Sequence, residues 1–279
     1  MLEYRGSAVA LAQLSEEDRL FKPSAPTHDL IGAVTPEDLT ASIRDVRRWL
    51  QAGRDVRSVL DDHYPRSLRE IFNRPPLLFI EGQFDEARDS HSVAIVGARR
   101  ASSEGRRRAA RMSRAAVEAG LCVMSGLAAG IDTAAHWAAL EADGRTVAVM
   151  GTGIDRIYPA ENRPLADAIM SAGGCLISQF FPSQQPTRWT FPNRNITMSG
   201  LALATIVIEA SETSGARMQA RVALQHGRTV FLLESLVNEH AWARKYVTEG
   251  AYGTHAIMIS SPEEVIERLA AAPAMSLVA

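Results

Sequence analysis

The sequence predicts an α/β protein with a doubly wound, mostly parallel sheet and a short N-terminal helical region. From residue 92 onward, short apolar runs alternate with helix-compatible segments, as expected for parallel strands covered on both faces by helices. In addition, 279 residues with a 46% hydrophobic share can bury an extensive core. The expected strands are residues 93–97, 121–125, 146–151, 174–178, 204–209, 229–233 and 255–259.

The N-terminal part of the chain has a different pattern. Thr35, followed by a proline, is a typical helix start, and an amphipathic stretch continues to Leu50 before a stop at Gly53. A brief apolar run at residues 77–80, preceded by two prolines, predicts an extended arm that leads into the main domain. The expected organisation is an N-terminal helical region (1–62), a main domain (63–270) and a frayed tail (271–279).

Charge and cysteine content limit the function classes. The formal net charge of −2 argues against indiscriminate coating of nucleic acid but allows a local basic groove. Cys122 and Cys175 both fall inside apolar runs, so we expect buried thiols and no disulfide or metal pair. The chain starts without a secretory pattern and has no apolar run near the roughly 18 residues of a membrane span. We therefore expect a cytoplasmic protein that does not contact membranes.

Residues 93–132 hold the strongest functional signal. Two apolar runs, 93–96 and 121–124, each end in a small turn that opens a helix, which is the pattern of a βαβ unit. The second turn, residues 125–130 (SGLAAG), lets backbone N–H groups approach a phosphate, because glycine has no Cβ and a helix N-terminus has free donors. Phosphate is the expected ligand. The candidate residues in this stretch are Gly97, Arg99, Arg100, Ser125, Gly126 and Gly130.

A second candidate segment is FPNRN at residues 191–195. It places a ring, a guanidinium and an amide at a helix start, a combination that can stack a base and hold its phosphate. In open α/β sheets, ligands bind beyond the carboxyl ends of the strands. We therefore expect segments 97–100, 125–132, 151–155, 179–195 and 209–215 to converge on one edge. The candidates from this segment are Phe191, Arg194 and Asn195.

Seven sequence blocks follow one another in a characteristic order. They are HYPRSLREIFNRPPLLFIEG, VAIVGARRAS, SGLAAGIDTAAH, RTVAVMGTGIDRIYPAEN, FPNRN, IVIEASETSG and ALQHGRTVFLL. Together they resemble the DprA (Smf) family of DNA-processing proteins over about residues 63–260. The resemblance implies an extended Rossmann-like fold that binds single-stranded DNA, usually as a homodimer, and hands it to the RecA recombinase. The strand-binding positions that it implies are Arg99, Ser125, Gly126, Gly130, Phe191, Arg194 and Asn195.

Departures from the family pattern leave other functions open. Ile196 replaces an arginine of the family, and residues 214–220 (SGARMQA) replace its SGSLxTA segment. The altered region 214–246 and the modest charge suit a phage-defence component or antitoxin that neutralises a phosphoribosyltransferase-like toxin. A small-nucleotide sensor or LOG-like hydrolase would share the phosphate loop, but EASETSGA at residues 209–216 lacks the PGGxGT hydrolase motif.

Catalysis has little support in the sequence. No nucleophile lies at a recognisable elbow near His136, so a packed histidine is expected there. The strand-end acids show no metal spacing, and Arg156 stands where a dinucleotide fingerprint needs its third glycine. We expect no enzyme activity, no cofactor and no metal. The arginines that we expect on a solvated helix face are Arg106, Arg107, Arg108 and Arg111.

Overall fold

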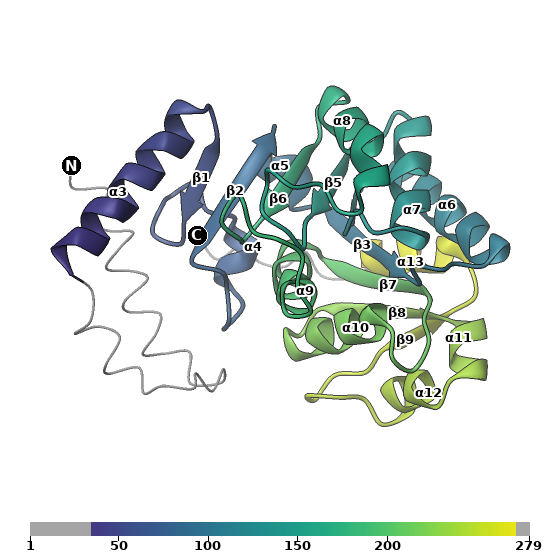
Figure 1. Ribbon diagram of the computed structural model, residues 1–279. Helices are drawn as coiled ribbons and strands as arrows, with labels where there is room; N and C mark the ends of the chain where they lie inside the picture. The colour runs from purple at the N-terminus through teal and green to yellow at the C-terminus, as the bar shows by residue number, and fades with distance from the viewer. Residues whose placement is uncertain (1–34, 272–279) are drawn as a thin grey trace.

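A nine-stranded sheet forms the centre of the molecule (Figure 1). The computed structural model describes residues 35–271. The strand order is β1-β2-β6-β5-β4-β3-β7-β8-β9, and the strands from β6 to β9 in this order all pair in parallel with one another. The strands are β1 (Asp55–Ser58), β2 (Leu77–Gly82), β3 (Ser92–Gly97), β4 (Cys122–Ser125), β5 (Thr146–Val149), β6 (Cys175–Ser178), β7 (Ala204–Glu209), β8 (Thr229–Leu233) and β9 (Ile257–Ile259).

Helices cover both faces of this sheet. One layer packs α6, α7, α8 and α13 against the sheet, and the other packs α4 and α9 to α12. The described helices are α3 (Pro36–Gln51), α4 (Arg66–Arg69), α5 (Glu86–Asp89), α6 (Ser103–Glu118), α7 (Ile131–Glu141), α8 (Arg163–Ser171), α9 (Thr190–Leu201), α10 (Gly215–Gln225), α11 (Glu234–Glu239), α12 (Ala241–Thr248) and α13 (Pro262–Ala271), with a 3-10 turn at Ala160–Asn162.

The doubly wound, mostly parallel sheet expected from the sequence is confirmed. All seven expected strands form. The apolar residues of β3 to β8 are buried on both faces of the sheet, whereas Met258 of the edge strand β9 is exposed. The extended arm at residues 77–80 needs correction: it is part of β2, which pairs antiparallel with β6. β1 was not expected, and it pairs antiparallel with β2 at the sheet edge. The sheet thus begins before the domain boundary placed at residue 62.

The helix expected after Thr35 is present as α3. Its capping box is complete, since the Thr35 hydroxyl accepts from the Asp38 amide at 3.2 Å and the Asp38 carboxylate accepts from the Thr35 amide at 3.0 Å. Near its end, the Trp49 ring packs edge-on against Phe79 of β2, with 4.9 Å between the ring centroids. This contact fixes α3 to the sheet edge. Of the tail expected at residues 271–279, Ala271 is the last residue of α13, and residues 272–279 lie outside the described residues.

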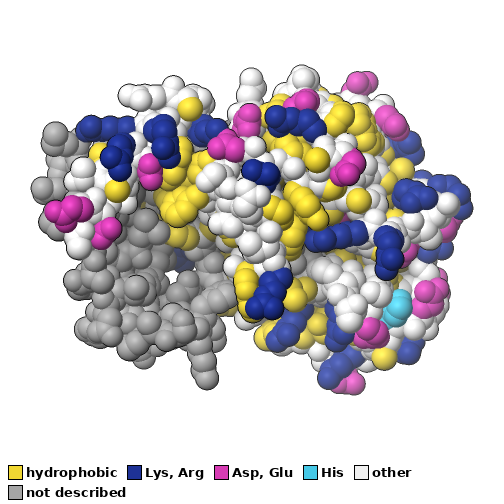
Figure 2. Space-filling view, in the orientation of Figure 1, with side chains coloured by type: hydrophobic (Ala, Val, Ile, Leu, Met, Phe, Trp, Pro, Cys, Tyr) yellow, Lys and Arg dark blue, Asp and Glu magenta, His cyan; other side chains and the backbone are white. Residues whose placement is uncertain are grey.

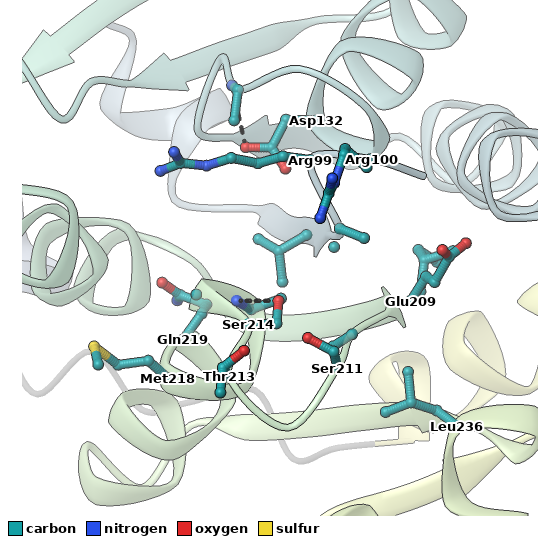
Figure 3. A pocket seen from close by; sticks show the side chains of 18 of the residues that line it. Arg99, Arg100, Asp132, Glu209, Ser211, Thr213, Ser214, Met218, Gln219 and Leu236 are labelled. Atoms are coloured by element: carbon teal, nitrogen blue, oxygen red, sulfur yellow. Dashed lines mark hydrogen bonds between the residues drawn. The ribbon is translucent and has the colours of Figure 1, made fainter. Parts of the chain in front are cut away.

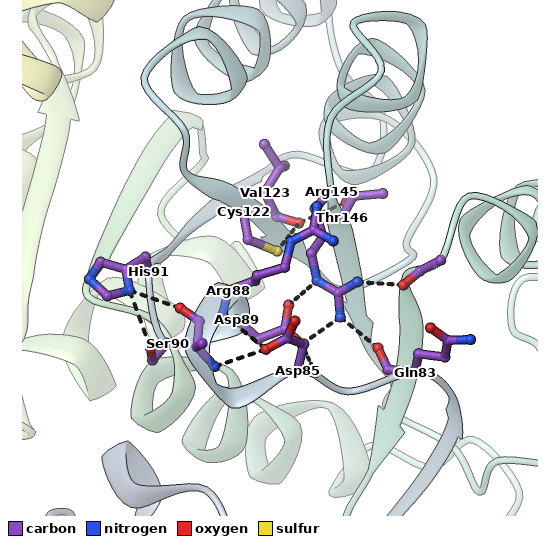
Figure 4. A network of polar contacts seen from close by, with 12 residues as sticks. Gln83, Asp85, Arg88, Asp89, Ser90, His91, Cys122, Val123, Arg145 and Thr146 are labelled. Carbon is purple, nitrogen blue, oxygen red and sulfur yellow. Dashed lines mark hydrogen bonds and ion pairs between the residues drawn. The ribbon is translucent and has the colours of Figure 1, made fainter.

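A buried ion pair joins the amino-terminal ends of the central strands (Figure 4). The Arg145 guanidinium donates to both carboxylate oxygens of Asp89 and to the backbone carbonyls of Gln83 and Gly173. The hydrogen bonds with Asp89 raise the pKa of Arg145. Because Asp89 ends the short helix before β3 and the two carbonyls lie beside the ends of β2 and β6, the network fixes the edge of the sheet opposite the strand carboxyl ends.

Two further sequence expectations are confirmed. His136 is fully buried and its Nδ1 lies 2.7 Å from the Thr146 hydroxyl, and Cys122 and Cys175 are buried free thiols. Within residues 35–271, no helix combines the length and apolar character needed to cross a bilayer.

Candidate functional site

An open groove lies beyond the carboxyl ends of the adjacent strands β3 and β7. β3 and β7 are adjacent, and the connections that follow them run in opposite directions along the sheet, which makes this the topological switch point. The groove has a volume of about 820 Å³. Figure 3 shows Arg99, Arg100 and Asp132 on one wall and Ser211, Thr213, Ser214, Met218 and Gln219 on the other, with Glu209 at one end. Ligand sites in α/β proteins have this position and size.

Two exposed arginines lie on the wall of the groove that is uppermost in Figure 3. Arg99 and Arg100 follow β3 directly, and both side chains are exposed to solvent. The Arg99 guanidinium lies over the Phe191 ring, 4.6 Å from its centroid. Gly151 supports the ring from another side, since a Cβ at this position would overlap it. The exposed Tyr158 ring lies 5.7 Å from the Phe191 ring, centroid to centroid. A guanidinium held in place by an aromatic stack can bind a phosphate or a base.

The SGLAAGID loop differs from the expectation. The Gly126 amide donates to the Asp132 carboxylate at 3.0 Å, and the Ala128 amide points to the same oxygen at 3.4 Å. The amide of Gly126 is therefore not a free phosphate donor, because a carboxylate of the same loop already accepts from it. Burial raises the pKa of Asp132, while the nearby Arg194 guanidinium and the two amides oppose this shift.

Arg194 is also an internal residue. Its side chain is only 7% exposed, donates to the Val149 carbonyl at 2.7 Å and to Asn195 Oδ1 at 3.2 Å, and covers Gly126 so closely that a Cβ there would overlap it. Burial lowers the pKa of Arg194. The expectation of Arg194 as an exposed phosphate contact is thus corrected: it reaches the groove wall but is held against the loop.

The other small residues of the expected site shape the backbone. Gly130 has φ +85°, and a Cβ there would overlap the carbonyls of Ala98 and Arg99. Gly97 is confined in the same way by the Ile131 side chain and the Glu209 carbonyl. The Ser125 hydroxyl is fully buried and donates to the Ile95 carbonyl at 2.6 Å. These residues hold the turn that carries Arg99 against the SGLAAGID loop.

The structure brings most of the expected site together. Lining the groove are Gly97, Arg99, Arg100, Phe191, Arg194 and Asn195. Ser125, Gly126 and Gly130 lie behind it, and their part in ligand binding stays a prediction. The sequence reading missed the contribution of α11, whose Ser235, Leu236 and Glu239 line one end. The strand-end rule, applied to β8 as it was to β7, would have found them.

The arginines of α6 behave mostly as expected. Arg107 and Arg108 pair with Glu104 at 2.7 and 3.0 Å, and Arg106 is exposed. Arg108 is the exception, because it also reaches the groove and donates to the Ser235 hydroxyl at 2.7 Å. Figure 2 shows basic side chains spread over the middle of the displayed face and around its right-hand side. Among residues 35–271, no group of three or more potential ligands could hold a metal ion.

Fold and site together define a doubly wound, Rossmann-like α/β protein with an open groove at the switch point, where Arg99 and Arg100 are exposed. The chain belongs to the DNA recombination-mediator protein A family, whose model matches residues 55–270. It is 42% identical over 176 residues to the DNA processing protein DprA of Streptococcus pneumoniae, covering 63% of this chain and 61% of that one. It is also 33% identical over 228 residues to DprA of Bacillus subtilis, covering 81% and 75%.

Solved structures show the same fold. The X-ray structure of DprA from S. pneumoniae matches with a TM-score of 0.71 and 30% identity, covering 92% of each chain. A structure of DNA processing protein A from Helicobacter pylori, described for its single-stranded DNA binding mode, matches with a TM-score of 0.67 at 23% identity, over 78% of this chain and 95% of that one. The chain spans 44% of the Smf relative from Synechocystis and 54% of that from Escherichia coli.

Proposed function

We propose that this protein is a cytoplasmic, non-catalytic single-stranded DNA-binding protein of DNA processing. The observation that carries the proposal is the open groove with two exposed guanidinium groups at the switch point, in a chain of this family. The family match favours this function over the antitoxin and the nucleotide-hydrolase hypotheses.

The groove suits a flexible polyanion. Arg99 and Arg100 would hold successive phosphates, and the hydroxyl groups of Ser211, Thr213 and Ser214 on the opposite wall can donate to further oxygens. The exposed Tyr158 ring packs near the Phe191 ring, and the exposed Trp189 lies two residues before Phe191 in the sequence. Both rings provide faces on which bases can stack. Such contacts do not read base edges, so sequence preference would be slight.

The family resemblance also motivates two proposals about partners. We expect a homodimer, and we expect the bound strand to pass to a RecA-type recombinase. A molar mass by light scattering tests the dimer: a single species at the monomer mass of 30.3 kDa, over the whole range of protein concentrations, would contradict it.

A salt titration with matched double variants tests the DNA-binding proposal. The test variant is Arg99→Ala with Arg100→Ala, and the control is Arg106→Ala with Arg107→Ala, which removes the same charge from the solvated face of α6. Each phosphate contact contributes about 0.7 to the slope of log K against log salt for a single strand. The test variant should therefore lose about 1.4 from this slope and bind an oligonucleotide at least about tenfold more weakly.

Comparing the two variants separates the effect of losing arginines in the groove from the effect of lowering the net charge of the protein. The control should bind with an unchanged salt slope, because Arg107 is already paired with Glu104 and Arg106 donates to the Ala101 carbonyl. Equal binding by wild type and test variant would reject the groove as the site. Arg194→Ala is unsuitable for this purpose, because removing a buried guanidinium would disturb the fold.

A further inference from the structure

Two helices begin at the switch point, and a carboxylate of this chain accepts from a backbone amide at or before the start of each. In the loop before α7, the Gly126 amide donates to the Asp132 carboxylate. At α6, the Glu209 carboxylate accepts from the Ser102 amide at 3.2 Å and from the Ser102 hydroxyl at 2.8 Å. Helix N-termini at this position are the usual phosphate sites of nucleotide-binding α/β proteins. In this protein the chain itself supplies the anion.

The Ser102 amide, the Ser102 hydroxyl and the first turn of α6 surround the Glu209 carboxylate, and we call these groups the α6 cradle. A Cβ on Gly105 would overlap the Glu209 carboxylate, so the glycine in the first turn of α6 makes room for this group. Ser102 is the N-cap of the helix, and its hydroxyl also accepts from the Gly105 amide at 2.8 Å. Glu209 is the last residue of β7 and lines the groove. The carboxylate therefore sits between the groove and the helix N-terminus.

We propose that Glu209 determines the ligand class of the groove by holding the α6 cradle and keeping the phosphate of a mononucleotide out of it. The inference deepens the proposed function and rests on it. A single phosphate group would have to compete with a tethered carboxylate that already makes three hydrogen bonds. A DNA strand needs no place in the cradle, because it presents several phosphates at once to the exposed Arg99 and Arg100.

Removing the carboxylate should open a phosphate site. In Glu209→Ala, the Ser102 amide, the Ser102 hydroxyl and the positive end of the 16-residue helix α6 lose their acceptor beside a cationic wall. The matched control is Glu212→Ala, which removes the same charge three residues later, from an exposed side chain that pairs with Arg217. Glu209→Gln keeps the shape of the side chain and removes only its charge.

Thermal unfolding with inorganic phosphate and with a 5′-deoxymononucleotide is the test. Wild type and Glu212→Ala should show no shift in Tm, since their cradle is occupied. Glu209→Ala should rise by about 2–4 °C when the ligand exceeds its dissociation constant about fivefold. Glu209→Gln should show a smaller rise, and it provides the measurement if the alanine variant does not fold.

Three outcomes would overturn the proposal. These are a Tm shift of wild type equal to that of Glu209→Ala, no shift in either Glu209 variant, or a shift of equal size in Glu212→Ala. An oligonucleotide titration of the same proteins separates this result from the proposed function: Glu209→Ala should bind the strand at least as tightly as wild type does. Failure of wild type to bind any oligonucleotide would reject the DNA-binding function, whatever the phosphate experiment gives.

Discussion

The guanidinium of Arg99 lies 4.6 Å from the centre of the Phe191 ring, which in turn packs against Gly151. The stack joins the turn after β3, the first turn of α9 and the end of β5, three segments far apart in the sequence. Because the guanidinium covers a face of the ring, a base cannot stack on that face while Arg99 stays in place. Phe191 is thus best understood as a support for Arg99.

Phe191→Leu tests this supporting role. The substitution keeps an apolar side chain against Gly151 but removes the ring face under Arg99, a contact worth about 0.5–1 kcal/mol at an exposed site. Oligonucleotide affinity should fall about two- to fivefold, while the salt slope stays at the wild-type value because no phosphate contact is lost. A titration at several salt concentrations measures both quantities. A slope lowered by about 0.7, the contribution of one phosphate contact, would show that Phe191 does more than position the guanidinium.

Gly130 connects the SGLAAGID loop with the turn that carries Arg99. Its dihedral angles of φ +85° and ψ −117° lie in a region that is essentially restricted to glycine, and a Cβ would overlap the carbonyl of Arg99. Gly130→Ala should therefore lower the free energy of unfolding by about 2 kcal/mol or more and weaken oligonucleotide binding.

Gly53→Ala is the matched control for Gly130→Ala. Gly53 also has a positive φ, +74°, but a Cβ there meets nothing within 4 Å. This variant should cost only the local backbone strain of about 1 kcal/mol and leave DNA binding unchanged. Chemical denaturation and a binding titration of both variants give the comparison. If Gly130→Ala bound DNA normally, the turn would not depend on this glycine.

The sequence carried the information for the strands buried on both faces but not for the sheet edge. β3 to β8 stand out as apolar runs because both of their faces are covered. β1 reads Asp-Val-Arg-Ser, with mostly half-buried side chains, and pairs only with β2. Its membership in the sheet depends on β2, whose paired residues lie 19 to 25 positions later in the sequence, and a short polar strand has no local pattern that indicates such a neighbour.

The position of the site could be predicted from the sequence, but not which of its charged side chains are buried and already hydrogen-bonded within the protein. The turn after β3 placed Arg99 at the switch point, as the strand-end rule implies. Nothing in the sequence around Arg194 indicated that its guanidinium would be buried and would donate to the Val149 carbonyl. The carboxylate that accepts from the Gly126 amide was easier to predict, since Asp132 follows only six residues later, in the first turn of α7. Acidic residues commonly stabilise this helix position.

His136 should make folding stability depend on pH. Burial lowers its pKa to about 3 from an ordinary value of 6.5, with a smaller contribution from Arg194. Below pH 6.5 the unfolded chain takes up a proton that the folded chain does not, so the free energy of unfolding falls as the pH drops. Between pH 7.5 and 5, this one group should remove about 2 kcal/mol, since each unit of pH below 6.5 costs about 1.4 kcal/mol.

Chemical denaturation at pH 7.5 and at pH 5 measures this contribution. His136→Gln removes the titrating ring, so its stability should change less between the two pH values than that of wild type, even if the variant is less stable overall. His63→Gln, at an exposed position before β2, should keep the wild-type pH dependence. An identical pH dependence in wild type and His136→Gln would contradict the assignment.

Trp189 extends the proposed DNA path beyond the groove. Its ring is 65% exposed at the start of α9, two residues before Phe191, and the Arg188 guanidinium lies over it at 4.8 Å. An exposed indole with an adjacent cation suits a stacked base next to a phosphate. Trp189→Ala should weaken oligonucleotide binding about fivefold or more, since stacking contributes about 1–3 kcal/mol per base.

Tryptophan fluorescence can detect this contact directly. Oligonucleotide addition should quench the emission of wild type, and most of the quenching should disappear in Trp189→Phe, which keeps an aromatic face for stacking. The matched control is Trp137→Phe, because Trp137 is also partly exposed but lies on α7. Its removal should leave both the quenching and the affinity as in wild type. Equal quenching in wild type and Trp189→Phe would mean that the strand does not reach the start of α9.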